Sequence, residues 1–192
     1  VADQISAAIP LLMISASYDL ATVGMLAMVH RVLGLPVALM SSSISQLVFQ
    51  RVSNNAGDQR ENIRKFLGLI MVGLTLVILP FALIIHYFGE DLFALVFGEV
   101  WRDAGRYASI MVLASSFTFV VSPLSVVFFM KKNIRLGTSW QFMRLVTIFL
   151  VMSYASQHDF EFFLYAFVLH QLVVYSIYLG LIFYGSRRNR IS

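Results

Sequence analysis

The sequence contains no cysteine, only four prolines in 192 residues and little charge. The absence of cysteine excludes disulfides and thiolate metal sites. Charged residues make up 12% of the chain, whereas an ordinary soluble domain carries about 25%. Hydrophobic residues make up 59%, and the mean hydropathy is +0.80. This composition excludes an ordinary soluble domain and indicates an integral membrane protein.

Six apolar runs fill most of the chain, at residues 5–18, 20–50, 63–88, 106–130, 135–156 and 160–184. A membrane-spanning helix needs about 20 mostly apolar residues, so these runs predict six transmembrane helices. The segment 89–105 mixes acids with large apolar residues, which predicts a short amphipathic helix in the outer membrane interface. Trp101 and Tyr107 are interpreted as aromatic residues of the interface belt. We therefore expect an all-α six-helix membrane bundle with one interfacial helix.

The charges between the runs alternate in sign. Basic residues gather in the second and fourth connections and after the sixth run: Arg51, Arg60, Arg64, Lys65, Lys131, Lys132, Arg135, Arg187, Arg188 and Arg190. Acids gather in the other connections: Asp19, Glu90, Asp91, Glu99, Asp103, Asp159 and Glu161. Because Lys and Arg stay on the cytoplasmic side, both ends of this sequence are expected in the cytoplasm. The basic flanks fit orientation and anionic lipid, so no nucleic-acid partner is expected.

Three ionisable side chains are expected deep in the membrane. Arg31 lies about 18 Å from the outer end of the second predicted helix, and Arg144 lies about 13 Å past Arg135, from the rise per helical residue. His170 is near the middle of the sixth predicted helix. A charge at the bilayer centre costs at least ~2.5 kcal/mol and marks a functional site by default. The alternative is a structural clamp that caps carbonyls freed by a proline kink.

Small and polar residues share a helix face with both arginines. Gly34, Ala38, Ser42 and Ser45 follow Arg31 at steps of three and four, with Gln46 beside them. On the fifth predicted helix, Gln141 precedes Arg144 by three residues, and Thr138 and Thr147 continue that side. We expect a hydrated cavity whose candidate substrate-binding residues are Arg31, Arg144, Gln46, Gln141, His170 and Gln171.

Three further residues are candidate hinges: Gly34, Pro36 and Pro123. They predict either points of bending during transport or passive kinks. The fourth run also carries a small-residue stripe at Ala108, Ser115 and Ser122, which predicts close helix packing. The sequence contains no paired carboxylates at depth, no metal-ligand spacing and no glycine-rich phosphate loop. We therefore expect no enzymatic activity, no cofactor and no metal.

Several segments form a series of recognisable motifs: HRVLGLP at 30–36, ISQLVFQR at 44–51, VFGEVW at 96–101, AGRY at 104–107 and SPLS at 122–125. These segments resemble polysaccharide flippases of the multidrug/oligosaccharidyl-lipid/polysaccharide superfamily. Their order and spacing agree with that family over most of residues 1–130, while the last two helices match only in hydropathy. The resemblance implies a twelve-span protein of two lobes, in which residues 1–192 form the C-terminal lobe and the N-terminal lobe is missing.

The resemblance also implies a function. Such proteins move an undecaprenyl-pyrophosphate-linked oligosaccharide, an O-antigen or exopolysaccharide repeat, across the bacterial inner membrane by alternating access. Arg31 and Arg144 would then attract the anionic head group, and Gln46, Gln141 and Gln171 would bind sugar hydroxyls. The expected partners are the lipid-linked oligosaccharide, membrane lipid, the missing lobe, and the polysaccharide polymerase and chain-length machinery.

Three alternatives stay open at this point. A cation-coupled exporter of the same superfamily would share the architecture and would be favoured by an intramembrane acid, which these runs lack at depth. A membrane-embedded enzyme of the same pathway would normally need a large outward loop with catalytic residues. A purely structural membrane subunit is the third, and the deep arginines argue against it.

Overall fold

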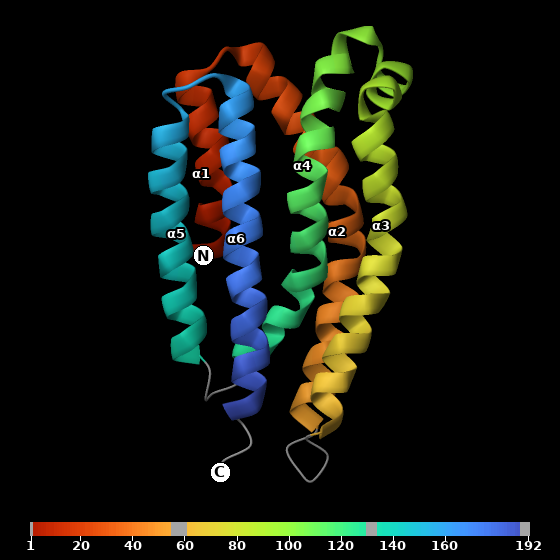
Figure 1. The fold of residues 1–192 in the computed structure, drawn as a ribbon, viewed down its shortest axis with the longest axis vertical. Helices are drawn as coiled ribbons and strands as arrows, with labels where there is room; N and C mark the ends of the chain where they lie inside the picture. Colours follow the sequence, from red (N-terminus) through yellow and green to blue (C-terminus); the bar gives the residue numbers. More distant parts are fainter. Residues whose placement is uncertain (1, 55–60, 130–133, 189–192) are drawn as a thin grey trace.

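The computed structural model describes residues 2–54, 61–129 and 134–188, which form a bundle of long helices (Figure 1). The elements in order are α1 (Ala2–Ser17), α2 (Leu20–Asn54), α3 (Glu61–Phe97), η1 (Glu99–Trp101), α4 (Arg102–Val121), η2 (Ser122–Phe129), α5 (Ile134–Ala155) and α6 (Phe160–Arg188). The two η elements are 3-10 helices. No β-strand occurs within these described ranges. The all-α fold expected from the sequence is therefore confirmed.

Three segments of the described chain are long and apolar enough to cross a membrane: Lys65–Phe97, Glu99–Ser125 and Phe160–Ile182. A shorter apolar segment covers Leu20–Leu35 at the start of α2. Along α3, large apolar side chains such as Leu69, Leu76 and Leu83 are exposed on the surface of the bundle. An exposed apolar face of this length suits contact with lipid and not with water. The structure is that of a membrane helix bundle.

The helices form two groups, with α1, α5 and α6 on one side and α2, α3 and α4 on the other (Figure 1). The turns at Tyr18–Asp19, Gly98–Trp101 and Ser156–Asp159 all lie at the upper end in this view. The ends of α2 and α6 and the starts of α3 and α5 lie at the lower end. The acidic connections of the sequence therefore share one end of the bundle.

The backbones of α3 and α4 approach each other closely at two glycines. A Cβ atom on Gly105 would lie 2.3 Å from the carbonyl oxygen of Gly89, and one on Gly89 would lie 2.7 Å from the oxygen of Gly105. Only glycine at both positions lets the two backbones come this close. His86 adds a contact of 3.0 Å from Nδ1 to the carbonyl oxygen of Ser109. The stripe of small residues predicted on this helix begins at Ala108, which is buried, and Gly105 continues it about one turn earlier.

The tip of the α3–α4 hairpin differs from the prediction. The separate interfacial helix expected over 89–105 is wrong, because α3 continues without a break through Phe97. Gly89 does not end the helix since it packs against α4. The chain turns at Gly98, whose φ of 99° is the left-handed conformation that glycine adopts without strain. A single 3-10 turn, η1, then leads into α4.

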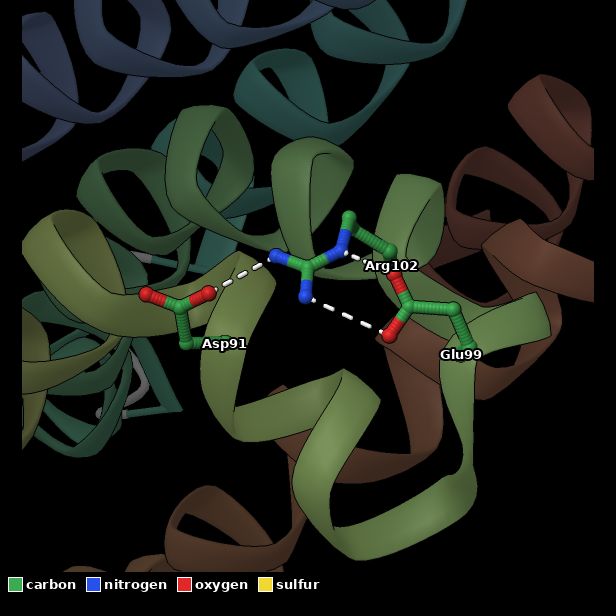
Figure 2. A network of polar contacts seen from close by, with 3 residues as sticks. All are labelled: Asp91, Glu99 and Arg102. Carbon is green, nitrogen blue, oxygen red and sulfur yellow. Dashed lines mark hydrogen bonds and ion pairs between the residues drawn. The ribbon is translucent and has the colours of Figure 1, made fainter.

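An ion-pair network holds this tip together (Figure 2). The Arg102 guanidinium donates from Nη1 to Asp91 Oδ1 at 2.7 Å and from Nε to Glu99 Oε1 at 2.6 Å. A third bond of 3.3 Å joins Nη2 to Glu99 Oε2, so the pair with Glu99 is bidentate. All three side chains are exposed to solvent. The network ties the end of α3 to the start of α4 without burying charge.

The fourth apolar run is also divided, not continuous over 106–130 as expected. The α-helical part ends at Val121, and η2 begins at Ser122. Pro123 has no N–H to continue the α-helical bond ladder, which explains the change to a tighter 3-10 helix there. The 3-10 helix is eight residues long, and such long runs are uncommon.

The upper turns are tied to one another through Tyr18. Its hydroxyl donates to the carbonyl oxygen of His158 at 2.9 Å, and its ring packs edge-on against Phe160 at 5.2 Å. Burial and the nearby Asp159 carboxylate raise the pKa of Tyr18. Tyr107 packs against Phe160 at 4.8 Å and is buried, so it does not face lipid as a residue of the interface belt was expected to.

Candidate functional site

Arg144 and His170 are the buried basic side chains of the described residues, each with 8% of its surface exposed. Arg144 lies at the midpoint of α5, and His170 lies near the midpoint of the apolar segment Phe160–Ile182 of α6. α5 and α6 are antiparallel neighbours (Figure 1). The two residues that the sequence placed deepest on these helices therefore lie inside the bundle and not on its lipid-facing surface.

Thr147 connects the two residues. His170 Nε2 lies 3.0 Å from Thr147 Oγ1, and the Thr147 hydroxyl donates to the backbone carbonyl oxygen of Arg144 at 3.2 Å. Thr147 thus contacts the His170 side chain across the α5–α6 interface and the backbone of Arg144 within α5. Sequence spacing had placed Thr147 on the same side of α5 as Arg144, and the structure shows what it contacts.

Aromatic rings continue this interface toward the lower end of the bundle. The Arg144 guanidinium carbon lies 5.3 Å from the centroid of the Tyr175 ring, within cation–π distance. Tyr178 packs against Tyr175 at 6.1 Å and stacks on Trp140 at 5.0 Å with an interplanar angle of 11°. The rings restrict the position of the guanidinium, which stays charged. A fixed cation in a low-dielectric interior is a strong attractor for an anion.

The structure does not bring all the predicted site residues together. Arg31 and Gln46 are exposed on α2, which packs on α1, α3, α4 and η2. α5 packs on α1, α6 and η2. Gln141 is half-buried one turn before Arg144, and Gln171 is half-buried next to His170. Within the described residues, the candidate site thus divides into a buried part on α5–α6 and an exposed part on α2.

The candidate hinges lie in three different settings. Gly34 is half-buried, and a Cβ atom there would meet no atom within 4 Å. Pro36 lies within helical α2, but its side chain is outside the part of the chain that the structure describes. Pro123 is buried at the junction of α4 with η2. Of the three, Pro123 coincides with a change of helix type.

Sequence reasoning missed Tyr175, Tyr178 and Trp140 as neighbours of Arg144. The chain has 14% aromatic residues, so one more ring in an apolar run carries little information by itself. A spacing signal was nevertheless present, because Trp140 precedes Arg144 by one helical turn and Tyr175 and Tyr178 share a face of α6. Which face of α6 meets α5 depends on helix rotation, which the sequence leaves open.

Several charged residues of the described chain are paired at the upper end of the bundle. Arg106 Nη1 lies 3.3 Å from Glu161 Oε1 and ties α4 to α6. Thr22 donates a hydrogen bond to the Asp19 carboxylate at the start of α2, and this bond lowers the pKa of Asp19. No three His, Cys, Asp or Glu side chains of the described chain come together as a metal site. The described polar side chains of this part of α5 and α6 are a guanidinium, an imidazole, amides and a hydroxyl.

Comparison with known protein families gives one match. The family described as polysaccharide biosynthesis protein matches residues 1–106, which include α1, α2, α3 and the first turn of α4. No curated protein and no solved structure matches the chain. Arg31 lies inside the matched part, whereas Arg144 and His170 lie beyond it. Because the match extends over more than half of the chain, the protein belongs to the polysaccharide biosynthesis protein family.

Proposed function

We propose that this chain is part of a membrane transporter that moves a lipid-linked oligosaccharide across the bacterial inner membrane by alternating access. The observation that carries the proposal is the buried Arg144 at the midpoint of a helix in an apolar bundle. A buried charge at that depth is costly to insert and is found mainly where it serves a function. The family supplies the context of polysaccharide biosynthesis.

The chemistry of the site suits an undecaprenyl-pyrophosphate head group. A guanidinium presents several N–H donors in a planar fork, which matches phosphate oxygens in a bidentate manner. The Tyr175 ring lies against the Arg144 guanidinium, 5.3 Å from its central carbon. In this proposal Gln141 and Gln171, half-buried beside Arg144 and His170, bind sugar hydroxyls. The lipid tails follow the exposed apolar surface of α3, outside the polar interior.

The exposed position of Arg31 is an argument for a second lobe in the complete protein. Its side chain is exposed on α2, in the apolar segment Leu20–Leu35. A cation at membrane depth is unstable against acyl chains, by at least ~2.5 kcal/mol. We therefore propose that this face of α2, with Arg31 and Gln46, borders water, substrate or the N-terminal lobe. The substrate then passes between the two lobes.

The test is to make Arg31→Ala and Arg144→Ala in the full-length protein and measure surface polysaccharide in cells. Both variants should lose most of the surface polysaccharide and accumulate lipid-linked repeats on the inner leaflet, while the amount of protein in the membrane is unchanged. Arg102→Ala is the matched control, because this arginine is exposed at the hairpin tip. Normal polysaccharide in both Arg31→Ala and Arg144→Ala would contradict the proposed function.

A further inference from the structure

Three tyrosine side chains of the described residues are exposed: Tyr87 of α3 at 72%, Tyr154 of α5 at 61% and Tyr165 of α6 at 57%. The other tyrosines whose side chains the structure describes are buried or half-buried. Tyr154 is in the last turn of α5 and Tyr165 is in the second turn of α6, at the upper end of the bundle (Figure 1). A ring with a polar edge suits a partner that is apolar on one side and wet on the other.

Tyr154 and Tyr165 lie at nearly the same level of the bundle. α5 and α6 are antiparallel, and Thr147 of α5 lies beside His170 of α6, with 3.0 Å between Oγ1 and Nε2. Seven residues higher on both helices, Tyr154 is level with Phe163. Tyr165 is two residues from Phe163, which is about 3 Å along the helix.

Tyr87 of α3 lies at this level too, as the contacts through α4 show. His86 contacts the carbonyl oxygen of Ser109, and Arg106, three residues higher on α4, pairs with Glu161 of α6. Because α4 and α6 run in the same direction (Figure 1), Ser109 is level with the third residue after Glu161. The three tyrosines therefore lie within about one helical turn, about 5 Å, of a common level.

The same order of side chains recurs at each of the three tyrosines. An exposed leucine lies one turn below each tyrosine, and an exposed ionisable side chain lies one turn above it. The leucines are Leu83, Leu150 and Leu169, and the ionisable residues are Asp91, His158 and Glu161. The surface of the bundle thus changes from apolar to ionisable across the level of the tyrosines. Such a change is what a membrane–water interface requires.

The distance from the tyrosines to basic residues near the lower end matches the thickness of a membrane core. Within their helices, the tyrosines are 22, 19 and 22 residues from Lys65, Arg135 and Arg187. These separations correspond to about 33, 29 and 33 Å of helix. The hydrocarbon core of a bilayer is about 30 Å thick. One core thickness therefore separates the level of the tyrosines from the basic residues on all three helices.

We infer that Tyr87, Tyr154 and Tyr165 form a belt that contacts the lipid–water interface at the upper side of the bundle. The partner is a lipid surface, with each ring against the acyl chains and each hydroxyl among the head groups. Because basic residues mark the cytoplasmic side, the belt contacts the outer leaflet. It replaces the belt expected from the sequence, since Tyr107 is buried and Trp101 packs against the core.

The belt determines how deep the bundle lies in the bilayer. Arg144 is ten residues below Tyr154 on α5. This is about 15 Å of helix, or half the thickness of the hydrocarbon core. The inference concerns contact with lipid and goes beyond transport, so it holds or fails independently of the proposed function.

The test measures depth by electron paramagnetic resonance on the full-length protein in phosphatidylcholine liposomes. This sequence contains no cysteine, so a spin label is attached at Leu83→Cys, Leu150→Cys or Leu169→Cys once any cysteine elsewhere in the full-length protein is replaced. Power saturation with oxygen and with a water-soluble nickel complex gives the depth of each label. All three labels should be accessible to oxygen and should share one depth within about 5 Å. Labels shielded from both reagents, or depths that differ by about 10 Å or more, would overturn the belt.

Substitutions of the belt test whether the tyrosines determine this depth. Tyr87→Leu, Tyr154→Leu and Tyr165→Leu together extend the apolar surface upward, so the label at Leu169→Cys should move about 3 Å toward the bilayer centre, about half a turn. Tryptophan at the same three positions should keep the depth, because its ring is also amphipathic. Phe149→Leu with Val173→Leu is the matched control, because both side chains are exposed and lack a polar edge. An unchanged depth in the triple leucine variant, or an equal shift in the control, would overturn the inference.

Discussion

The α3–α4 hairpin and the α5–α6 pair are both antiparallel helix pairs, but they are held together in different ways. In α3–α4, two backbones touch at Gly89 and Gly105, and the ion pairs of Arg102 lie at the exposed tip. In α5–α6, polar side chains cross the interface at mid-depth, with His170 bonded to Thr147 and Arg144 stacked on Tyr175.

Comparing the two pairs shows which contacts are needed to hold two helices together and which are not. The α3–α4 pair shows that this protein can pack two long helices tightly without a charge at the crossing, because van der Waals contact between small residues is sufficient in a membrane. A buried arginine is therefore not needed to join α5 to α6. Its burial there, at the midpoint of an apolar helix, is the reason for assigning the candidate site to this pair.

The range of the family match also separates the α3–α4 hairpin from the α5–α6 pair. Residues 1–106 include α3 and the start of α4, up to and including Gly105. The α5–α6 pair, with Arg144 and His170, lies beyond that range. The matched part therefore contains the glycine crossing that supports the architecture, and the unmatched part contains the buried basic pair.

The largest expected effect on stability comes from a substitution that separates α3 and α4 where Gly89 and Gly105 meet. In Gly105→Ala the new Cβ atom would lie 2.3 Å from a backbone oxygen, so α3 and α4 must separate. The free energy of unfolding should fall by about 3 kcal/mol, as for severe overpacking. Unfolding of the purified protein in detergent, followed by circular dichroism, measures the change. Gly73→Ala is the matched control, because a Cβ atom on Gly73 of α3 meets nothing within 4 Å. Equal stability of the two variants would show that the backbones are not in contact.

A smaller loss of stability is expected when the hydrogen bond between Thr147 of α5 and His170 of α6 is removed. Thr147→Val keeps the shape of the side chain but leaves the buried His170 Nε2 without its hydrogen-bond partner. Such an unsatisfied buried polar atom costs about 2 kcal/mol of stability. Thr75→Val is the control in the same unfolding experiment, because the exposed Thr75 hydroxyl bonds only within its own helix, to Met71. If both variants lose the same stability, the contact between Thr147 and His170 does not contribute.

The smallest effect is expected at the hairpin tip. Arg102→Gln removes the ion pairs with Asp91 and Glu99, but these groups are exposed and screened by water and salt. The melting temperature should fall only slightly at low salt and should match the wild type at high salt. Thermal melts at the two salt concentrations measure this. A large loss that persists in high salt would mean that the tip, and not the glycine crossing, holds the hairpin.

The sequence predicted these helices well, because they follow the apolar runs. The starts and ends of α1, α2, α5 and α6 follow the apolar runs within a few residues. Arg144 and His170 lie near the middle of their helices and inside the bundle, and their depth in a membrane stays a prediction. Thr147 was expected on the side of α5 that carries Arg144, and a period of 3.6 residues is enough to show this.

The remaining features depend on contacts between distant residues. The third helix was expected over the apolar run 63–88, yet α3 continues past Gly89, which packs against Gly105. The break occurs at Gly98, where the backbone needs a positive φ. Arg31 and Arg144 were assigned to one cavity, but helix packing places Arg31 on the exposed face of α2. Their joint role in a cavity stays a prediction.

The central claim is that the buried Arg144 serves transport and not folding, and Arg144→Met tests it most directly. The free energy of unfolding and the rate of lipid-linked oligosaccharide transfer are measured on the same full-length protein in liposomes. The account predicts unchanged or slightly raised stability, because an apolar side chain of similar length replaces a costly buried charge, together with loss of transfer. A fall in stability of about 3 kcal/mol or more, with transfer retained, would show that Arg144 is a structural clamp and would contradict the account.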